Sequence, residues 1–555
     1  MFQPEAAPVG GSLALSALVA ALPLVTLFVL LGALKWKAWQ AGLTSLVVAI
    51  MVAVAFFGMP ASQALITATE GGAFGLFPII YIVLTAIWIF RLTELTGYDL
   101  VLRRAFASVS PDQRVQAILI AFCFGALLEA LAGFGTPVAI TAVMLIALGF
   151  QPIKAAAVAL VANTAPVAFG AIAIPIITLG EITGLPKEDL GAMVGRQTPL
   201  LALFVPLILV GMVDGMRGVR QTWPAAVVGG FVFAIAQFAC SNYISVELTD
   251  IVASLLATGA IVALLQVWQP SEPIRGERFE RGGPAIAGAA VADPAMEAEI
   301  RRKDDDHRDT KGEIAVAYAP YLIIIAIFGI AQIGPVKTFL TDLGSEFTWP
   351  GLDIRTPDGE AVSSTTFKFN WATAAGSLLL VAGLLTMIVL KLSPGRALKV
   401  YGRTLNQLKW ATLTVASVLA LAYVMNLSAQ TITLGLWIAG AGGILAFLSS
   451  IIGWIGVAVT GSDTSSNSLF GALQVSAAKE AGLDPTLLAA ANSSGGVLGK
   501  MISPQNLAIG AAAVGLGGRE GELFRRVVGW SLVLLLIMCV LVYLQSTAVL
   551  SWMVV

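Results

Sequence analysis

The stretch that decides the fold runs from Gly461 to Pro504; it opens GSDTSSNSLF at residues 461–470 and closes NSSGGVLGKMISP at residues 492–504. Small hydroxyl, amide and glycine residues are dense in it, although the sequence around it is as apolar as a membrane helix. In hydrocarbon every backbone N–H and C=O group needs a partner within the protein, so such a segment is tolerated only where it is buried or lines a wet cavity. We therefore expect interrupted helices inside a membrane protein.

The first half of the chain carries a second copy of this pattern. Three of its residues precede identical residues of the second half by 329 positions each (492 − 163 = 329): Asn163 and Asn492, Gly170 and Gly499, Pro175 and Pro504. Matched hydrophobic segments that are interrupted by Gly and Pro point to a transporter whose binding site lies between inverted repeats. Chance similarity in a chain rich in Gly and Ala is the alternative.

The composition bounds the class of protein. Of the 555 residues, 57% are hydrophobic and 12% are charged, and the mean hydropathy is +0.88, whereas a soluble domain has about 25% charged residues. We expect a chain that crosses a membrane many times. The net charge of −1 argues against nucleic acid. The one histidine, His307, lies in a polar segment and the three cysteines are far apart, so no metal site, disulfide or cofactor is expected.

Apolar runs of about 20 residues, long enough to span a bilayer, follow one another along both halves. In the first half they lie at 12–34, 38–57, 76–95, 197–214, 222–243 and 249–268, with a connection at 58–75, a re-entrant hairpin at 115–150 and a run at 155–180 broken at 163–166. In the second half they lie at 313–333, 371–391, 405–425 and 526–550, with a hairpin or else full spans at 431–478 and a run at 485–513 broken at 492–496. The predicted fold is an all-α polytopic membrane protein of about 12 transmembrane helices plus two re-entrant hairpins, with inverted-topology repeats and broken helices.

The charges of the loops orient these runs. Arg and Lys follow the run at 76–95 and recur at 217–220 and throughout 269–312, whereas the connection at 58–75 has neither. By the positive-inside rule the N-terminus is outside and 269–312 is cytoplasmic. We expect three parts: a first repeat with connecting helices at 1–268, a cytoplasmic linker at 269–312, and a second, inverted repeat at 313–555.

Six blocks of the sequence are distinctive: PDQRVQ (111–116), FCFGALLEALAGFGTPVAIT (122–141), ANTAPVAFGAIAIPI (162–176), MVGRQ (193–197), VTGSDTSSN (459–467) and GKMISPQNLAI (499–509). They resemble the bacterial L-lactate permease family, and the likeness covers nearly the whole chain apart from 269–312. The resemblance implies a multi-pass protein of the bacterial cell (inner) membrane that imports L-lactate, and often D-lactate and glycolate, by proton symport. A wider likeness in fold to hairpin-containing elevator-type ion transporters implies a homodimer.

A 2-hydroxy monocarboxylate presents a carboxylate, a hydroxyl and a small apolar body, so its site needs N–H and O–H donors beside an apolar wall. The N-termini of broken helices supply such donors with a partial positive charge. We therefore predict that the substrate is bound by residues of the broken runs and the hairpin tips: Thr136, Asn163, Thr164, Ser465, Ser466, Asn492, Ser493, Ser494 and Gly495. The alternative for each residue is that it only satisfies broken backbone.

Ionisable residues within membrane runs are costly and are therefore functional candidates. Glu129 and Asp463 are the predicted proton carriers, with Asp463 favoured; Asp463 could instead cap the N–H groups of its own hairpin tip. Lys500 is predicted to pair with an acid or the substrate, or else to reach the interface. Asp214 is predicted to pair with Arg217. Four residues near span ends are expected to be solvated or interfacial: Glu70, Glu94, Arg91 and Arg196.

The function predicted from the sequence is secondary transport: import of lactate together with a proton. A channel, or a transporter for another small carboxylate, is the alternative, although a channel would need a continuous polar pore and polarity is concentrated here in two segments. An enzyme is disfavoured because the HExxH and GxSxG motifs are absent from the sequence. The expected partners are small 2-hydroxy monocarboxylates, protons and the lipid bilayer, with no nucleic acid.

Overall fold

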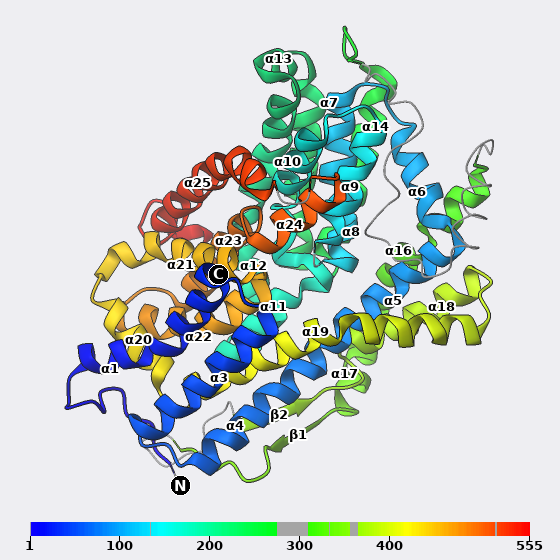
Figure 1. Ribbon diagram of the computed structural model, residues 1–555. Coiled ribbons are helices and arrows are strands. Elements are labelled where there is room, and N and C mark those ends of the chain that lie inside the picture. Colours follow the sequence, from blue (N-terminus) through cyan, green and yellow to red (C-terminus); the bar gives the residue numbers. More distant parts are fainter. Residues whose placement is uncertain (1, 134, 275–308, 332, 356–364, 517–518) are drawn as a thin grey trace.

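The computed structural model describes residues 2–133, 135–274, 309–331, 333–355, 365–516 and 519–555, and it is built almost entirely of helices (Figure 1). Within these residues, 10 helices are long and apolar enough to cross a membrane, or up to 11 if a bent pair counts as one span. One of them, Lys187–Tyr243, contains two of the predicted runs. The prediction of an all-α multi-pass membrane protein is therefore confirmed.

The first half consists of α1 (Leu13–Ala20), α2 (Leu22–Phe28), α3 (Ala38–Ala55), α4 (Ala61–Phe74), α5 (Tyr81–Thr96), α6 (Tyr98–Ala107), α7 (Gln113–Gln116), α8 (Gly125–Ala132), α9 (Thr136–Ala147), α10 (Pro152–Ala162), α11 (Gly170–Thr183), α12 (Lys187–Val194), α13 (Thr198–Tyr243) and α14 (Thr249–Val267). Short π and 3-10 segments join some of them: η1 (Val29–Ala33), η2 (Gly75–Ile80), η3 (Ala117–Phe124) and η4 (Val167–Phe169).

The second half consists of α16 (Lys311–Ala331), α17 (Gly334–Asp342), α18 (Ala375–Val389), α19 (Pro394–Leu427), α20 (Gln430–Ala439), α21 (Leu445–Thr460), α22 (Asp463–Ala481), α23 (Pro485–Lys500), α24 (Pro504–Ala513) and α25 (Glu520–Gln545), with 3-10 turns η6 (Gly442–Ile444) and η7 (Ser551–Met553). Strands β1 (Ser345–Thr348) and β2 (Thr366–Phe369) pair antiparallel outside the bundle (Figure 1). Most of the predicted linker, 275–308, lies outside the described residues.

The long helix α13 doubles back on itself at Asp214, which agrees with two predicted runs at this place. The φ/ψ angles there are non-helical, and Gly230 packs directly on the backbone of Ala202 and Leu203. The predicted pair of Asp214 with Arg217 is wrong. Asp214 pairs instead with the fully buried Arg114 at 3.1 Å, because the turn aims its carboxylate at α7.

The predicted connection at 58–75 is wrong, because α4 occupies most of it. Two glycines of this segment are packing positions: a Cβ at Gly71 would lie 2.7 Å from the carbonyl oxygen of Leu419, and one at Gly75 would lie 2.8 Å from the Cα of Ala416. Both contacts are to α19, so the absence of a side chain lets α4 and α19 approach closely. Glu70 is only 1% exposed between them, so of its two predicted positions, solvated or interfacial, the solvated one is wrong.

The centre of the molecule is built from two hairpins and two broken helices. The hairpins join α8 to α9 and α21 to α22, and the broken helices are α10 with α11 and α23 with α24. The packing is reciprocal, because α9 contacts α24 and α22 contacts α11. The second arm of each hairpin thus packs on the second part of the other half's broken helix, as repeats related by pseudo-symmetry would do.

One predicted break is right and the other is misplaced. Helix α10 ends at Ala162, and the chain resumes 66° away in η4 and α11, which agrees with the break at 163–166. Helix α23 runs without interruption through 492–496 and ends only at Lys500. The small residues there serve close packing: a Cβ at Gly495 would overlap the carbonyl of Ser450 in α21. The break lies at 501–503 instead.

The remaining helices flank this centre. Helix α19 packs on α3, α4, α5 and α22, and so connects the N-terminal helices to the second hairpin (Figure 1).

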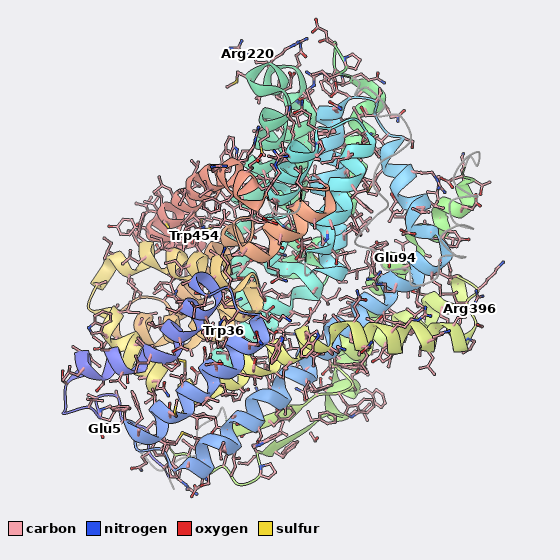
Figure 2. All side chains as sticks on the ribbon, in the orientation of Figure 1. Glu5, Trp36, Glu94, Arg220, Arg396 and Trp454 are labelled. Carbon is pink, nitrogen blue, oxygen red and sulfur yellow. The ribbon has the colours of Figure 1, made fainter. Side chains whose placement is uncertain are left out.

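Figure 2 shows Glu5 at the lower left of the molecule, Arg220 at its top and Arg396 at its right edge. Arg220, which is expected on the cytoplasmic side, thus lies away from Glu5. Glu5 is near the N-terminus, which is expected outside.

Candidate functional site

A cavity of about 580 Å³ lies where the two hairpin tips approach each other. Its walls come from α8, α11, α22 and α23, and from α3 and α19 on the other side. Three ionisable side chains from the membrane runs line it, Glu129, Asp463 and Lys500. Cavities of this size suit small ligands.

Glu129 is fixed by donors from two broken helices. Its Oε1 forms an ion pair with Nζ of Lys500 at 2.5 Å, and its Oε2 accepts a 2.9 Å hydrogen bond from Nδ2 of Asn163. The Glu129 and Lys500 side chains are only 4% and 8% exposed. Gly170 leaves room for the carboxylate, because a Cβ there would lie 2.8 Å from Oε1. Lys500 therefore pairs with an acid, as one of the predictions had it.

Asp463 is the buried acid at the tip of the second hairpin. Its Oδ2 accepts a 2.6 Å hydrogen bond from the hydroxyl of Ser493, and a Cβ at Gly496 would overlap its other oxygen. The alternative prediction that Asp463 caps its own tip is wrong, because the N-cap of α22 is Ser462, whose hydroxyl accepts from the N–H of Ser465. The Asp463 carboxylate instead points at α23.

The beginning of α11 is strained where it borders the cavity. Ala171, Ile172 and Ala173 have φ angles of +46°, +59° and +57°, and a left-handed conformation is a genuine outlier for a β-branched residue such as Ile172. Backbone of this kind persists only where the surroundings enforce it, and it clusters at functional sites. Ala171 itself lines the cavity beside Gly170.

A buried chain of side-chain amides lies behind the cavity. Gln474 donates to Oδ1 of Asn492 at 3.3 Å, Asn492 donates to Oδ1 of Asn467 at 2.9 Å, and Asn467 donates to the Pro175 carbonyl at 3.1 Å. Gln474 also exchanges hydrogen bonds with Ser449 of α21. The chain therefore links α21, α23, α22 and α11, and its three amide side chains are 0% exposed.

The structure places the predicted site residues in three groups. Ser465 lines the cavity together with the three ionisable residues. Asn163 and Ser493 lie behind the residues that line the cavity. Asn163 donates to Glu129, and Ser493 donates to Asp463. The others do not line the cavity: Thr136, Thr164, Ser466, Asn492, Ser494 and Gly495.

Some members of the last group have other partners. Thr164, in the turn after α10, donates to the Val161 carbonyl at 2.7 Å, and Ser466 donates to the Gly453 carbonyl across the hairpin at 3.2 Å. The predicted donors at Asn492–Gly495 are absent because these residues lie inside α23, where the backbone N–H groups are used by the helix. The first turn of α22, from Asp463 to Ser465, lines the cavity instead.

Sequence reasoning missed several residues of the wall. Trp39 of α3 and Trp410 of α19 stack with ring centroids 4.9 Å apart, and both line the cavity with Lys37, Thr414 and Gln505. Neither tryptophan was predicted to line the site, because Trp39 and Trp410 are 371 residues apart in the sequence and no local pattern joins them.

The arrangement is suited to binding a small anion. Lys500 supplies a cation, the first turn of α22 supplies N–H groups and a partial positive charge, and Thr464 and Ser465 supply hydroxyls. Within the described residues, no group of three or more His, Cys, Asp or Glu residues could hold a metal ion.

Known proteins resemble this chain over nearly its whole length. The family model "L-lactate permease" matches residues 16–549. The L-lactate permease of Bacillus subtilis (strain 168) is 40% identical over 569 residues, covering 99% of this chain and 98% of that protein. The glycolate permease of Escherichia coli (strain K12) is 40% identical over 551 residues, covering 97% of both.

A solved structure, that of the Alcanivorax borkumensis YdaH transporter, is 15% identical and covers 84% of both chains with a TM-score of 0.41. The match of the family model and the identity with curated permeases extend over nearly the whole length. The chain therefore belongs to the L-lactate permease family.

Proposed function

We propose that the protein imports L-lactate, and also D-lactate and glycolate, by proton symport across the bacterial cell (inner) membrane. The observation that carries the proposal is the cavity at the two hairpin tips, in which one buried cation lies between two buried carboxyl groups. A monovalent organic anion and a proton are the two ligands that such a set can exchange.

The substrate carboxylate is proposed to contact Nζ of Lys500 and the N-terminal N–H groups of α22. The 2-hydroxyl then lies within reach of the hydroxyls of Thr464 and Ser465 in the same turn. The apolar body faces Val167 and Ile174. Backbone N–H groups at a helix N-terminus recognise a carboxylate without requiring a second charged side chain.

Glycolate and lactate differ by one methyl group, and one methylene in an apolar pocket is worth only about 1–3 kcal/mol. A cavity of about 580 Å³ has room for either. The names of the relatives support both substrates, since one is a glycolate permease and the other an L-lactate permease at the same identity. We therefore propose a substrate class rather than a single acid.

Proton symport is supported by charge. Moving one anion inward against a negative interior costs about 2.3 kcal/mol per 100 mV, and one proton per anion removes this cost. Glu129 and Asp463 are the two candidate proton-coupling acids, since both line the cavity. We further propose that the protein works as a homodimer.

The test is counterflow of labelled L-lactate in proteoliposomes that contain the purified protein. We expect unlabelled L-lactate, D-lactate or glycolate inside to drive uptake of the label, and an inward proton gradient to concentrate it. Liposomes without protein provide the background. Flux that follows the membrane potential without counterflow would indicate the anion channel instead.

A further inference from the structure

The ion pair of Glu129 and Lys500 lies inside the cavity where the substrate is proposed to bind. Nζ of Lys500 is 2.5 Å from Oε1 of Glu129, and both residues line the cavity. A lysine ammonium has three N–H donors, and within the described residues Glu129 is the only acceptor that Nζ reaches. Its other donors are therefore available to a ligand in the cavity.

A buried ammonium requires a counter-ion, because an unpaired charge in a medium of low dielectric is strongly disfavoured. We propose that Lys500 binds one anion at a time: the Glu129 carboxylate when the site is empty, and the substrate carboxylate when Glu129 is protonated. This inference rests on the proposed function and names the group that couples its two ligands.

The exchange balances charge in both states. In the empty site, the Glu129 anion and the Lys500 cation sum to zero. In the loaded site, the Glu129 carboxylate has gained one proton and is neutral. The substrate anion has taken the place of the Glu129 anion beside the Lys500 cation, so these charges again sum to zero. Neither the proton nor the anion binds well alone, since each would leave an uncompensated buried charge. Coupling with a ratio of one proton per anion follows.

Asp463 differs from Glu129 in its surroundings. Within the described residues it forms no ion pair, and its carboxylate is held by the hydroxyl of Ser493. Lys500 acts on it only through space. Since no cation is released when Asp463 gains a proton, the exchange assigns coupling to Glu129, whereas the sequence favoured Asp463.

The other ionisable groups around Glu129 do not compete for this role. Helix α8 packs on α5, α9, α11, α14 and η3. Helix α14 contributes Asp250, which is 0% exposed and accepts from Gln237 at 3.1 Å. Helix α5 contributes Arg91 and Glu94, which pair with each other at 2.6 Å. The sequence of α9 has no titratable residue; α11 has Glu181 near its C-terminal end, and η3 has Cys123.

The experiment measures the dissociation constant of labelled L-lactate at several pH values, with purified protein in lipid nanodiscs. Because binding of the anion is linked to uptake of one proton, the constant of the wild type should rise about tenfold per pH unit once Glu129 is ionised in the empty site. For Glu129→Gln we expect a constant that does not change with pH. For Asp463→Asn we expect the slope of the wild type.

Two further variants complete the design. Glu480→Gln makes the same acid-to-amide change on the exposed end of α22, and its pH profile should coincide with that of the wild type. Lys500→Gln should lose most lactate binding at every pH. The proposal is overturned if the dissociation constant of Glu129→Gln still changes with pH. It is also overturned if the pH dependence is lost in Asp463→Asn and kept in Glu129→Gln.

If Glu129→Gln does not fold, the variants Glu129→Asp and Asp463→Glu test the proposal in its place. Each keeps a carboxyl group and changes the length of the side chain by one methylene. We expect the midpoint of the pH profile to move in Glu129→Asp only; a shift in Asp463→Glu only, or in neither, contradicts the exchange. Failure of the proposed function has a different appearance, since the wild type would then show no lactate or glycolate counterflow at all.

Discussion

The side-chain amide of Asn163 donates a 2.9 Å hydrogen bond to Glu129 from the residue that ends α10, so the break in the helix places the donor beside the acid. The second half has an analogous pair, in which Ser493 of α23 donates to Asp463 at 2.6 Å. In both halves a polar residue of the broken helix thus orients an acid of the hairpin that precedes it. The two acids are held alike, although only Glu129 has a cationic partner.

We predict that Asn163→Ala strengthens lactate binding at pH values where Glu129 is ionised in the empty site. The substitution leaves the Glu129 carboxylate of the empty state buried without its donor at Oε2, which costs that state about 1–3 kcal/mol and favours exchange for lactate by roughly 5- to 150-fold in affinity. Thr164→Val is the matched control, because among the residues that the structure describes the Thr164 hydroxyl donates to the Val161 carbonyl of the preceding helix and not to Glu129. Equal effects of the two variants on the dissociation constant would show that the break, rather than the contact to Glu129, is responsible.

A methyl group at Gly496 should be far more harmful than one at Gly510. The added Cβ of Gly496→Ala would overlap Oδ1 of Asp463, and the close packing of α23 on α21 prevents the helix from moving away. Overpacking of this kind costs about 1–3 kcal/mol. In Gly510→Ala the nearest atoms lie at 3.6 Å, an ordinary contact distance. Thermal unfolding and lactate affinity of both variants in nanodiscs check this, and wild-type values for Gly496→Ala would contradict the geometry at Asp463.

The predicted orientation can be tested with cysteines. Cys123, Cys240 and Cys539 are all buried, so a maleimide that does not cross membranes should react only with introduced thiols. We expect Ser345→Cys, on the exposed strand β1, to react in intact cells, and Ser271→Cys, also exposed, to react only after the membrane is opened. Labelling of both from the same side would refute the topology that the loop charges indicate.

The membrane spans and three ionisable residues that line the cavity could be predicted from the sequence, because both predictions rest on the energetics of the membrane interior. Length and apolarity define a membrane run, and an ionisable residue within such a run is too costly to be incidental. Glu129, Asp463 and Lys500 were found in this way, and all three line the cavity. The break after Ala162 was found because the sequence that follows, NTAP, contains a proline that cannot continue a helix regularly.

The rest depended on neighbours that the sequence does not reveal. Glycine permits both an unwound turn and a close helix contact, and only the Ser450 carbonyl opposite Gly495 shows that 492–496 is a contact. The stacked pair of Trp39 and Trp410 joins two distant helices, so no local pattern could place it in the wall of the cavity.

Our last prediction concerns Asn492, which the sequence placed in the binding site and the structure places behind it. We expect Asn492→Ala to lower stability more than lactate affinity. Its amide donates to Asn467 and accepts from Gln474, and all three side chains are 0% exposed. Removal of the amide leaves a buried oxygen and a buried N–H group without these partners, at about 1–3 kcal/mol each.

The measurement compares thermal unfolding and lactate affinity of Asn492→Ala with those of Asn163→Ala. We expect the midpoint of unfolding to fall clearly in Asn492→Ala, with affinity changed less than in Asn163→Ala, whose side chain contacts Glu129 directly. A large loss of affinity without a loss of stability would mean that Asn492 contacts the substrate. In that case the amide chain from Gln474 to Pro175 would have to open during transport, since Asn492 does not line the cavity in this structure.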